Sequence, residues 1–330
     1  MVVETGVAVR RVTAQLGALL LALGVVASII GNSLHPSRED PMDNPRVFQE
    51  YAQSDAWVAA HLGQFAGYLF AFAGLVVLCQ LLLGERARAT VAAYLGMAAA
   101  AASLAVAAVL QAVDGIALKA LVDSWAQASG PQQAVAFGAA ESVRWLEIGI
   151  NSLFRLLQGT TLVVIGLALT LGERFPRWIG WLGIICGLAL VLRGIAVAFV
   201  GFDLSNPVYF STGVVTSLPV TLLNLWMAAL AIVMWGGSQP PFHGSLMAAA
   251  APLTLPEALS WYRVDGALEG SWRLPARQRP RPHNATDHRI GVPGVRRLLV
   301  LGLAVFLMLG LALPAWAQTG QTSTSEASVV

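Results

Sequence analysis

The sequence is poor in charge and in lysine, and this scarcity excludes most classes of soluble protein. Only 12% of the 330 residues are charged, 56% are hydrophobic, and the mean hydropathy is +0.67. Soluble domains carry about 25% charged residues, so the composition predicts an integral membrane protein. The net charge of +2 is too small to indicate a nucleic-acid partner. Lys119 is the only lysine, and the preference for arginine and alanine is typical of a GC-rich bacterial genome.

The sequence also lacks the motifs of several common enzyme classes. Its two cysteines, Cys79 and Cys186, lie in apolar runs without CxxC or Cys/His zinc spacing, so we expect them to be buried small residues. HExxH, GxSxG, a Walker loop and GxGxxG are all absent. Only two histidines precede residue 237, too few for bis-histidine ligation of two haems. We therefore predict no cofactor, and a non-enzymatic function is favoured over an enzymatic one.

Long apolar runs dominate what the sequence does contain. A helix needs about 20 apolar residues to cross a bilayer, and seven runs are long enough: 12–32, 57–83, 91–113, 148–171, 178–201, 214–236 and 297–317. The first run has no cleavage site after it, which predicts a membrane anchor. We expect an all-α fold, a polytopic transmembrane bundle of six core helices over residues 1–236.

The segment after this predicted bundle has a different character. Residues 237–296 are rich in proline and arginine, which predicts a largely disordered cytoplasmic linker. Residues 297–330 contain the seventh apolar run, which has the form of a signal peptide ending at Ala317. Two interpretations stay open: a C-terminal transmembrane helix with a short outer tail, or an appended segment that is cleaved after Ala317.

The distribution of basic residues predicts the orientation. Fourteen arginines lie before the first run or in the alternate loops that share its side, against three arginines and Lys119 in the other loops. The positive-inside rule therefore predicts a multi-pass protein of a bacterial plasma membrane with a cytoplasmic N-terminus. Residues 74–96 and 161–183 resemble each other, since both predict a helix, a Gly-Glu-Arg turn and a returning helix. Duplication and coincidence both remain open for this similarity.

Polar side chains interrupt the predicted spans at matching depths. Arg155 and Arg193 lie about seven and eight residues from the outer ends of their helices, so both are expected about 10–12 Å inside. Intramembrane ionisable residues are functional candidates by default. The amides and ionisable groups at similar levels complete the candidate site, which comprises Arg155, Arg193, Asn151, Gln158, Gln64, His61, Asp114, Glu147 and Asn224.

Two main hypotheses account for this polar cluster. In the first, the two arginines bind a small anion or a lipid headgroup at an outward-facing site through forked hydrogen bonds. In the second, they pair with Glu147 and Asp114, and the protein is a structural or assembly subunit whose cluster only fixes helix packing. A proton or ion pathway through His61 and Asp114 is a third. The expected partners are membrane lipids and, on the first hypothesis, a small anionic ligand.

The first outer loop, residues 35–57, provides a further candidate. Its segment "PRVFQEYAQS" predicts a short amphipathic helix lying over the polar site. His35 and His61 are expected to approach each other there, and two histidines with carboxylates can bind a transition metal. The spacing matches no metal-binding motif, so an interfacial histidine among solvated acids is the alternative.

Several short stretches resemble a known group of proteins. The pattern "HP…DP…F…YAQSDAWVAAHLGQFAGYLFAFAGLVVL" and the paired Gly-Glu-Arg turns are similar to those of uncharacterised bacterial multi-pass membrane proteins that share a domain of unknown function. The resemblance covers about residues 12–236. It implies a helical membrane fold and transfers no functional residue.

Overall fold

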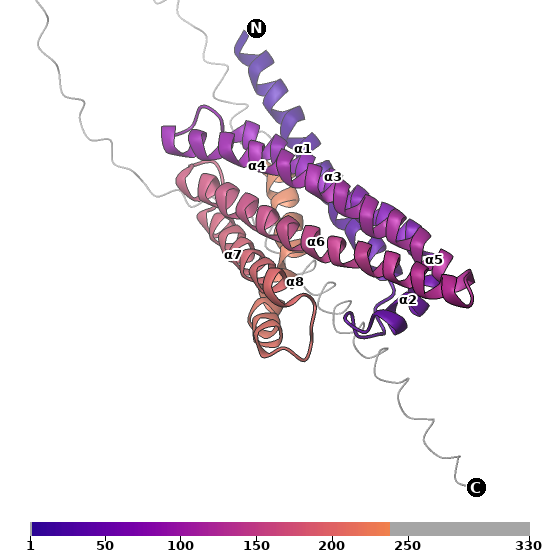
Figure 1. The fold of residues 1–330 in the computed structure, drawn as a ribbon. Coiled ribbons are helices and arrows are strands. Elements are labelled where there is room, and N and C mark those ends of the chain that lie inside the picture. The colour runs from indigo at the N-terminus through magenta and orange to yellow at the C-terminus, as the bar shows by residue number, and fades with distance from the viewer. Residues whose placement is uncertain (1, 238–330) are drawn as a thin grey trace, which may run out of the picture. The chain divides into compact units, whose positions relative to one another are not determined.

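Residues 2–237 form a bundle of helices (Figure 1). The computed structural model describes these residues, and the predicted linker, C-terminal helix and cleavage after Ala317 lie outside the described residues. The helices are α1 (Val2–Leu34), α2 (Asn44–Ala52), α3 (Trp57–Leu82), α4 (Ala87–Ala112), the π-helix η1 (Val113–Leu118), α5 (Lys119–Gln127), α6 (Pro131–Leu171), α7 (Arg177–Val200) and α8 (Pro207–Gly237).

The described residues contain no strand, and six of their helices are long and apolar enough to cross a membrane. The predicted all-α fold and the six core helices are therefore confirmed. Helix α6 packs against α4 and α7, while α1 packs against α3 and α8. Helices α1 and α3 pack closely at Gly24, where a Cβ atom would lie 2.7 Å from the backbone nitrogen of Ala71 on α3. Because that contact is with backbone, α1 and α3 approach this closely only where a side chain is missing.

Two helices are much longer than the apolar runs that predicted them. Residues 87–127 and 131–171 each form a continuous helical stretch of 41 residues, about 60 Å long. The predicted end of one helix at residue 113 and the predicted start of the next at residue 148 were therefore wrong. A hydrocarbon core is only about 30 Å thick, so these helices have length to spare for a projecting hairpin.

This hairpin forms a second apolar core with α2. Phe48 and Trp57 are fully buried in it, and its other buried members are Val47, Tyr51, Leu118, Val122 and Ala140. The Asp43 carboxylate accepts the backbone N–H of Arg46 at the start of α2, which is the usual way an exposed helix begins. The predicted amphipathic helix is confirmed, and its apolar face covers this end of the bundle.

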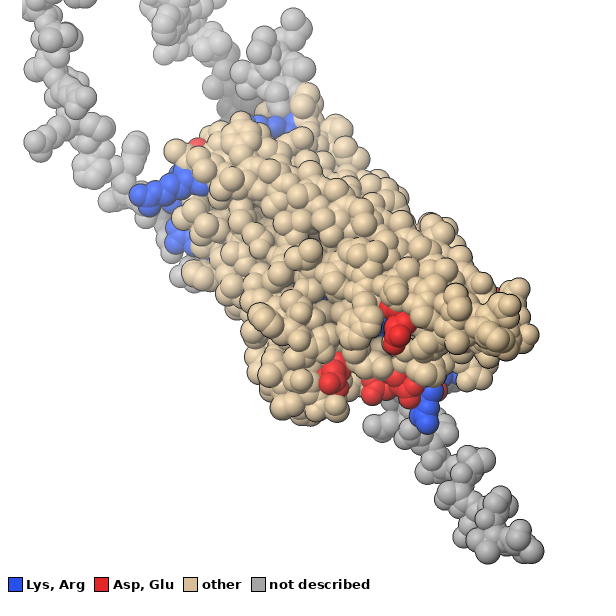
Figure 2. All heavy atoms as spheres, in the orientation of Figure 1, with Lys and Arg blue, Asp and Glu red and all other residues tan. Residues whose placement is uncertain are grey.

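Charge is divided between the two ends of the bundle. On the face drawn in Figure 2, Lys and Arg side chains lie at both ends, whereas most of the Asp and Glu side chains lie at the end near α2. The two Gly-Glu-Arg turns meet at the basic end, where Arg86 forms an ion pair with Glu173. The backbone N–H of Glu173 also donates to the Glu85 carboxylate at 2.8 Å. The two similar hairpins, α3–α4 and α6–α7, therefore turn side by side.

Candidate functional site

A cavity of about 650 Å³ lies at the acidic end of the bundle. Loop residues 36–41 and α2 form one wall, and residues from α1, α3, α4, η1 and α6 form the other, with the segment around Phe202 and Tyr209 closing it. The cavity therefore lies where the projecting hairpin and the loop after α1 meet the membrane-length helices.

The cavity brings together five of the nine predicted site residues. They come from three separate parts of the sequence and are Gln64, Asp114, Glu147, Asn151 and Arg155. His61 lies directly behind this wall, because its ring contacts Asp114. The remaining three, Gln158, Arg193 and Asn224, do not line the cavity.

Arg155 lines the cavity from α6 without an acidic partner in reach. Its Nε donates to Asn151 Oδ1 at 2.6 Å, and no carboxylate of the described residues lies within salt-bridge distance of it. Arg193 lies at a similar level on α7. Ser152, three residues before Arg155, donates to the carbonyl of Gly194, the residue after Arg193, at 3.0 Å. The two arginines therefore lie at similar levels along the neighbouring helices α6 and α7, and their depth in a membrane stays a prediction.

Arg193 nevertheless does not line the cavity, although its partner Tyr209 does. Its Nη2 donates to the hydroxyl of Tyr209 at 3.2 Å, and its guanidinium lies 5.3 Å from the centroid of the same ring. Within residues 2–237 it has no salt bridge either. The hypothesis that Arg155 and Arg193 pair with Glu147 and Asp114 is therefore wrong, because both acids have other partners.

Glu147 pairs with Arg144, which lies three residues earlier on α6. The Arg144 Nη1–Glu147 Oε2 distance is 2.6 Å, and both residues are buried inside α6. Arg144 also donates to the carbonyl of Pro41 at 3.1 Å and lies over the rings of Tyr51 and Phe202. This one guanidinium thus joins α6, α2, the loop before α2 and the segment after α7.

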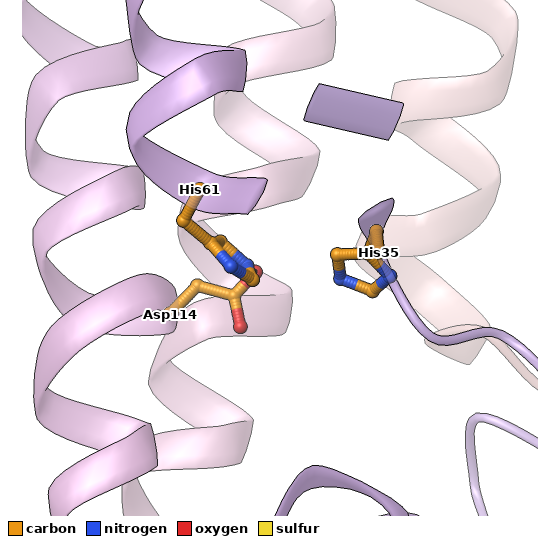
Figure 3. Close-up of side chains that lie close together, drawn as sticks. All are labelled: His35, His61 and Asp114. Carbon is orange, nitrogen blue, oxygen red and sulfur yellow. The ribbon is translucent and has the colours of Figure 1, made fainter. Parts of the chain in front are cut away.

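Asp114 pairs with His61, and His35 lies opposite them (Figure 3). The His61 Nε2–Asp114 Oδ2 distance is 3.1 Å, and His61 Nδ1 lies 2.8 Å from the carbonyl oxygen of Trp57. The centroids of the two imidazole rings are 5.0 Å apart. The expected approach of His35 and His61 is therefore confirmed. Trp57 Nε1 donates to the Asp114 carbonyl at 3.2 Å, so α3 also holds the π turn in place.

The π-helix η1 determines how closely these groups approach. A Cβ atom at Gly115 would lie 2.8 Å from Cγ of His61, so this position accepts only glycine without a shift of the ring. π-Helical turns occur often at functional sites. Here the turn leaves Asp114 Oδ1 buried without a hydrogen-bond partner, and Gln111 Oε1, one turn earlier, is in the same state.

Burial changes the acidity of two groups that lie outside the membrane-length helices. It lowers the pKa of His35 below the ordinary value, and the neighbouring His61 adds to this effect. Burial also raises the pKa of Tyr51 above its ordinary range, which keeps the phenol neutral.

Sequence reasoning missed several residues of the cavity. Arg144, Tyr51 and Gln111 were not among the candidates, and neither were Tyr68 and Tyr209. The three-residue spacing of Arg144 and Glu147 was a usable sign of their pairing, because residues three apart are neighbours on a helix. Partners of the tyrosines depend on how the helices pack, which the sequence does not display.

Comparison with known proteins supports the resemblance seen in the sequence. A family model described as Domain of unknown function (DUF4386) matches residues 16–235. Searches among curated proteins and among solved structures found no match. The matched segment covers about two-thirds of the chain and includes every residue of the cavity described above. The chain belongs to the DUF4386 family, whose domain has no assigned function.

Proposed function

We propose that this protein binds a small anion, or the anionic group of a lipid headgroup, in the cavity at the acidic end of the bundle. The protein is multi-pass, lies in a bacterial plasma membrane and has its N-terminus in the cytoplasm, so that the cavity faces outward. The observation that supports binding is Arg155, a guanidinium that lines the cavity and is bonded only to a neutral amide.

Arg155 has the hydrogen-bonding capacity that an oxyanion requires. A guanidinium has five N–H donors in a planar fork, and only the Nε donor of Arg155 has a partner among the described residues. The two terminal nitrogens remain for a carboxylate or phosphate, which accept such forks bidentately. Arg193, one helix away at the same level, adds positive potential without competing for the ligand.

The acidic residues on the opposite wall of the cavity favour a ligand that is small or that carries a positive charge at one end. Glu39 and Asp40 of the loop and Glu50 of α2 line it. The Glu50 carboxylate is fixed there, because it accepts the backbone N–H groups of Arg38 and Glu39 at 2.9 and 3.3 Å. A large polyanion would be repelled by these acids, whereas a single phosphate or a zwitterionic headgroup fits the division of charge.

The test uses the full chain in detergent with two probes, inorganic phosphate and a short-chain phosphatidylethanolamine. We expect one of them to raise the thermal unfolding temperature of the wild type, and Arg155→Gln to weaken this binding at least about tenfold, because a charged hydrogen bond of about 1.5–3 kcal/mol is lost. Glutamine preserves an amide donor for Asn151. The matched control is Arg88→Gln, which removes an exposed arginine near the opposite end of the bundle.

The pattern of responses separates the sources of the anion. A response to phosphate indicates a free anion, and a response to the lipid alone indicates a headgroup. If Arg155→Gln binds both probes as the wild type does, Arg155 is not the anchor. If neither probe shifts the unfolding of the wild type, the binding proposal fails.

The alternative function, a structural or assembly subunit, has one observation in its favour. The buried Arg144–Glu147 pair fixes four segments to one another and leaves no free charge for a ligand. Packing therefore accounts for Arg144 and Glu147, whereas it does not account for Arg155.

A further inference from the structure

We propose that His35, His61 and Asp114 form a binding site for a divalent transition metal of the zinc class, with an open coordination position that faces the cavity. This inference is independent of the anion proposed above, because it uses none of the same side chains.

The three residues offer the ligand atoms of a known type of metal centre. They come from the loop directly after α1, the first turns of α3 and the π-helix η1, and one ligand atom of each lies within 4.8 Å of the others. Tetrahedral zinc with bonds of about 2.0–2.1 Å places its ligand atoms about 3.3–3.5 Å apart. A shift of His35 by at most about 1.5 Å, on a segment outside any helix, closes this difference. Figure 3 shows the His35 ring across from the His61–Asp114 pair.

Backbone carbonyl groups fix both imidazole rings in the tautomer that a metal requires. His35 Nδ1 lies 2.6 Å from the carbonyl oxygen of Pro36, and His61 Nδ1 lies 2.8 Å from that of Trp57. Because a carbonyl oxygen only accepts, each Nδ1 carries the proton and each Nε2 keeps its lone pair. Metal-ligating histidines almost always donate their other N–H in this way.

Asp114 is left with an oxygen that nothing in the described residues satisfies. Its Oδ2 is 3.1 Å from His61 Nε2, and its Oδ1 is buried without a partner. Since His61 Nδ1 already holds a proton, the contact between Nε2 and Oδ2 requires one additional proton. A metal ion between these two atoms replaces that proton and supplies the buried carboxylate with a counter-charge, which resolves an otherwise costly arrangement.

Two imidazoles and one carboxylate leave zinc with an incomplete coordination shell. Catalytic zinc sites with His₂Glu ligands keep the fourth position for water or substrate. His35 and Asp114 both line the cavity, so the remaining position faces it. Gln111 Oε1, which also lines the cavity and has no partner, is placed to accept a hydrogen bond from a metal-bound water.

The test measures zinc bound to the full chain, purified in detergent through a tag that contains no histidine. We expect about one tightly bound zinc per chain after reconstitution, measured by elemental analysis and by competition with a chromogenic chelator. His35→Ala and Asp114→Asn should each weaken zinc binding by more than about 100-fold, since even outer partners of ligands are worth 10–100-fold. Cobalt added in place of zinc should produce the visible absorption of a four- or five-coordinate site, and both variants should lose it.

Two controls separate this site from incidental binding and from misfolding. Asp123→Asn removes an acid that pairs with Lys119 on the same helical hairpin, and it should leave zinc affinity unchanged. The triple variant His243→Gln/His283→Gln/His288→Gln removes the other histidines and should also retain zinc. Circular dichroism and size-exclusion profiles identify any variant that fails to fold, and His35→Ala, on a loop, is the one expected to fold normally. If folded His35→Ala binds zinc like the wild type, or if the triple variant loses it, the proposal is wrong.

Discussion

The buried ion pair between Arg144 and Glu147 permits the most direct test of how this bundle is held together. Both residues are nearly inaccessible, at 4% and 1% relative exposure, and they lie three residues apart on α6. We consider three variants: Arg144→Met, Glu147→Leu and the double variant with both changes. Each replacement is an apolar side chain that fills much of the space of the original one. The variants therefore differ from the wild type mainly in charge.

The expected energies follow from which charge each variant leaves behind. Removing one partner of a buried pair costs about 3–5 kcal/mol, because the other charge remains buried without compensation. The double variant leaves no charge and loses mainly the hydrogen bond from Arg144 to the Pro41 carbonyl, worth about 1.5–3 kcal/mol for a charged donor. The double variant should therefore be no less stable than either single variant. If the two effects were additive, its loss of unfolding free energy would instead be about twice that of a single variant.

The assay is equilibrium unfolding by sodium dodecyl sulfate in mixed micelles, followed by tryptophan fluorescence. The matched control is the ion pair between Arg86 and Glu173, whose side chains are 56% and 67% exposed. The same cycle there should give less than about 1 kcal/mol for any change. If the losses at Arg144 and Glu147 simply add, the two charges do not stabilise each other and our account of this pair is refuted.

Three further outcomes are expected. Gly24→Val should destabilise the protein by about 1–3 kcal/mol through overpacking against α3, whereas Gly149→Ala, with open space around it, should be neutral or slightly stabilising in the same unfolding assay; equal effects would contradict the packing at α1. In intact cells, a membrane-impermeant maleimide should label Asp40→Cys and not Arg88→Cys if the N-terminus is cytoplasmic, and the reverse pattern would overturn that orientation. Ser103→Ala should cost about 0.6 kcal/mol, typical of hydrogen bonds between membrane helices, because its hydroxyl bonds a threonine of α6 at 2.9 Å; an unchanged stability would mean that this bond contributes nothing.

The sequence predicted the helices well where they are apolar and poorly where they are not. The six spans follow from hydropathy alone, because a bilayer-length apolar run has few alternatives to a helix. The same criterion ended one helix at 113 and began the next at 148, since the residues between are amphipathic. They are helical because α2 covers their apolar side, with Val122 and Ala140 fully buried there. A contact between distant segments produced this structure, and no local window contains it.

The candidate site was predictable in its location and less so in its pairings. The similar level of Arg155 and Arg193 followed from helix geometry, and the approach of His35 to His61 followed from the amphipathic loop. The choice of partner for Glu147 depends on distance along one helix face, where Arg144 is nearer than Arg155. The orientation of Asp114 depends on a π turn, which has no sequence signature comparable to that of a cap or a β-turn.

The charges on the helical wall of the cavity favour the binding proposal over the packing alternative. Arg144 and Glu147 neutralise each other, and His61 with Asp114 forms a second unit that is neutral when it shares one proton. On this wall, Arg155 is then the charge that remains, and a protein that needed only rigid helices would gain little from a half-buried guanidinium without an acid. A divalent metal in place of the shared proton would add one positive charge to the same wall. Both proposals therefore make the helical side of this cavity more favourable to an anion, although the loop opposite is acidic.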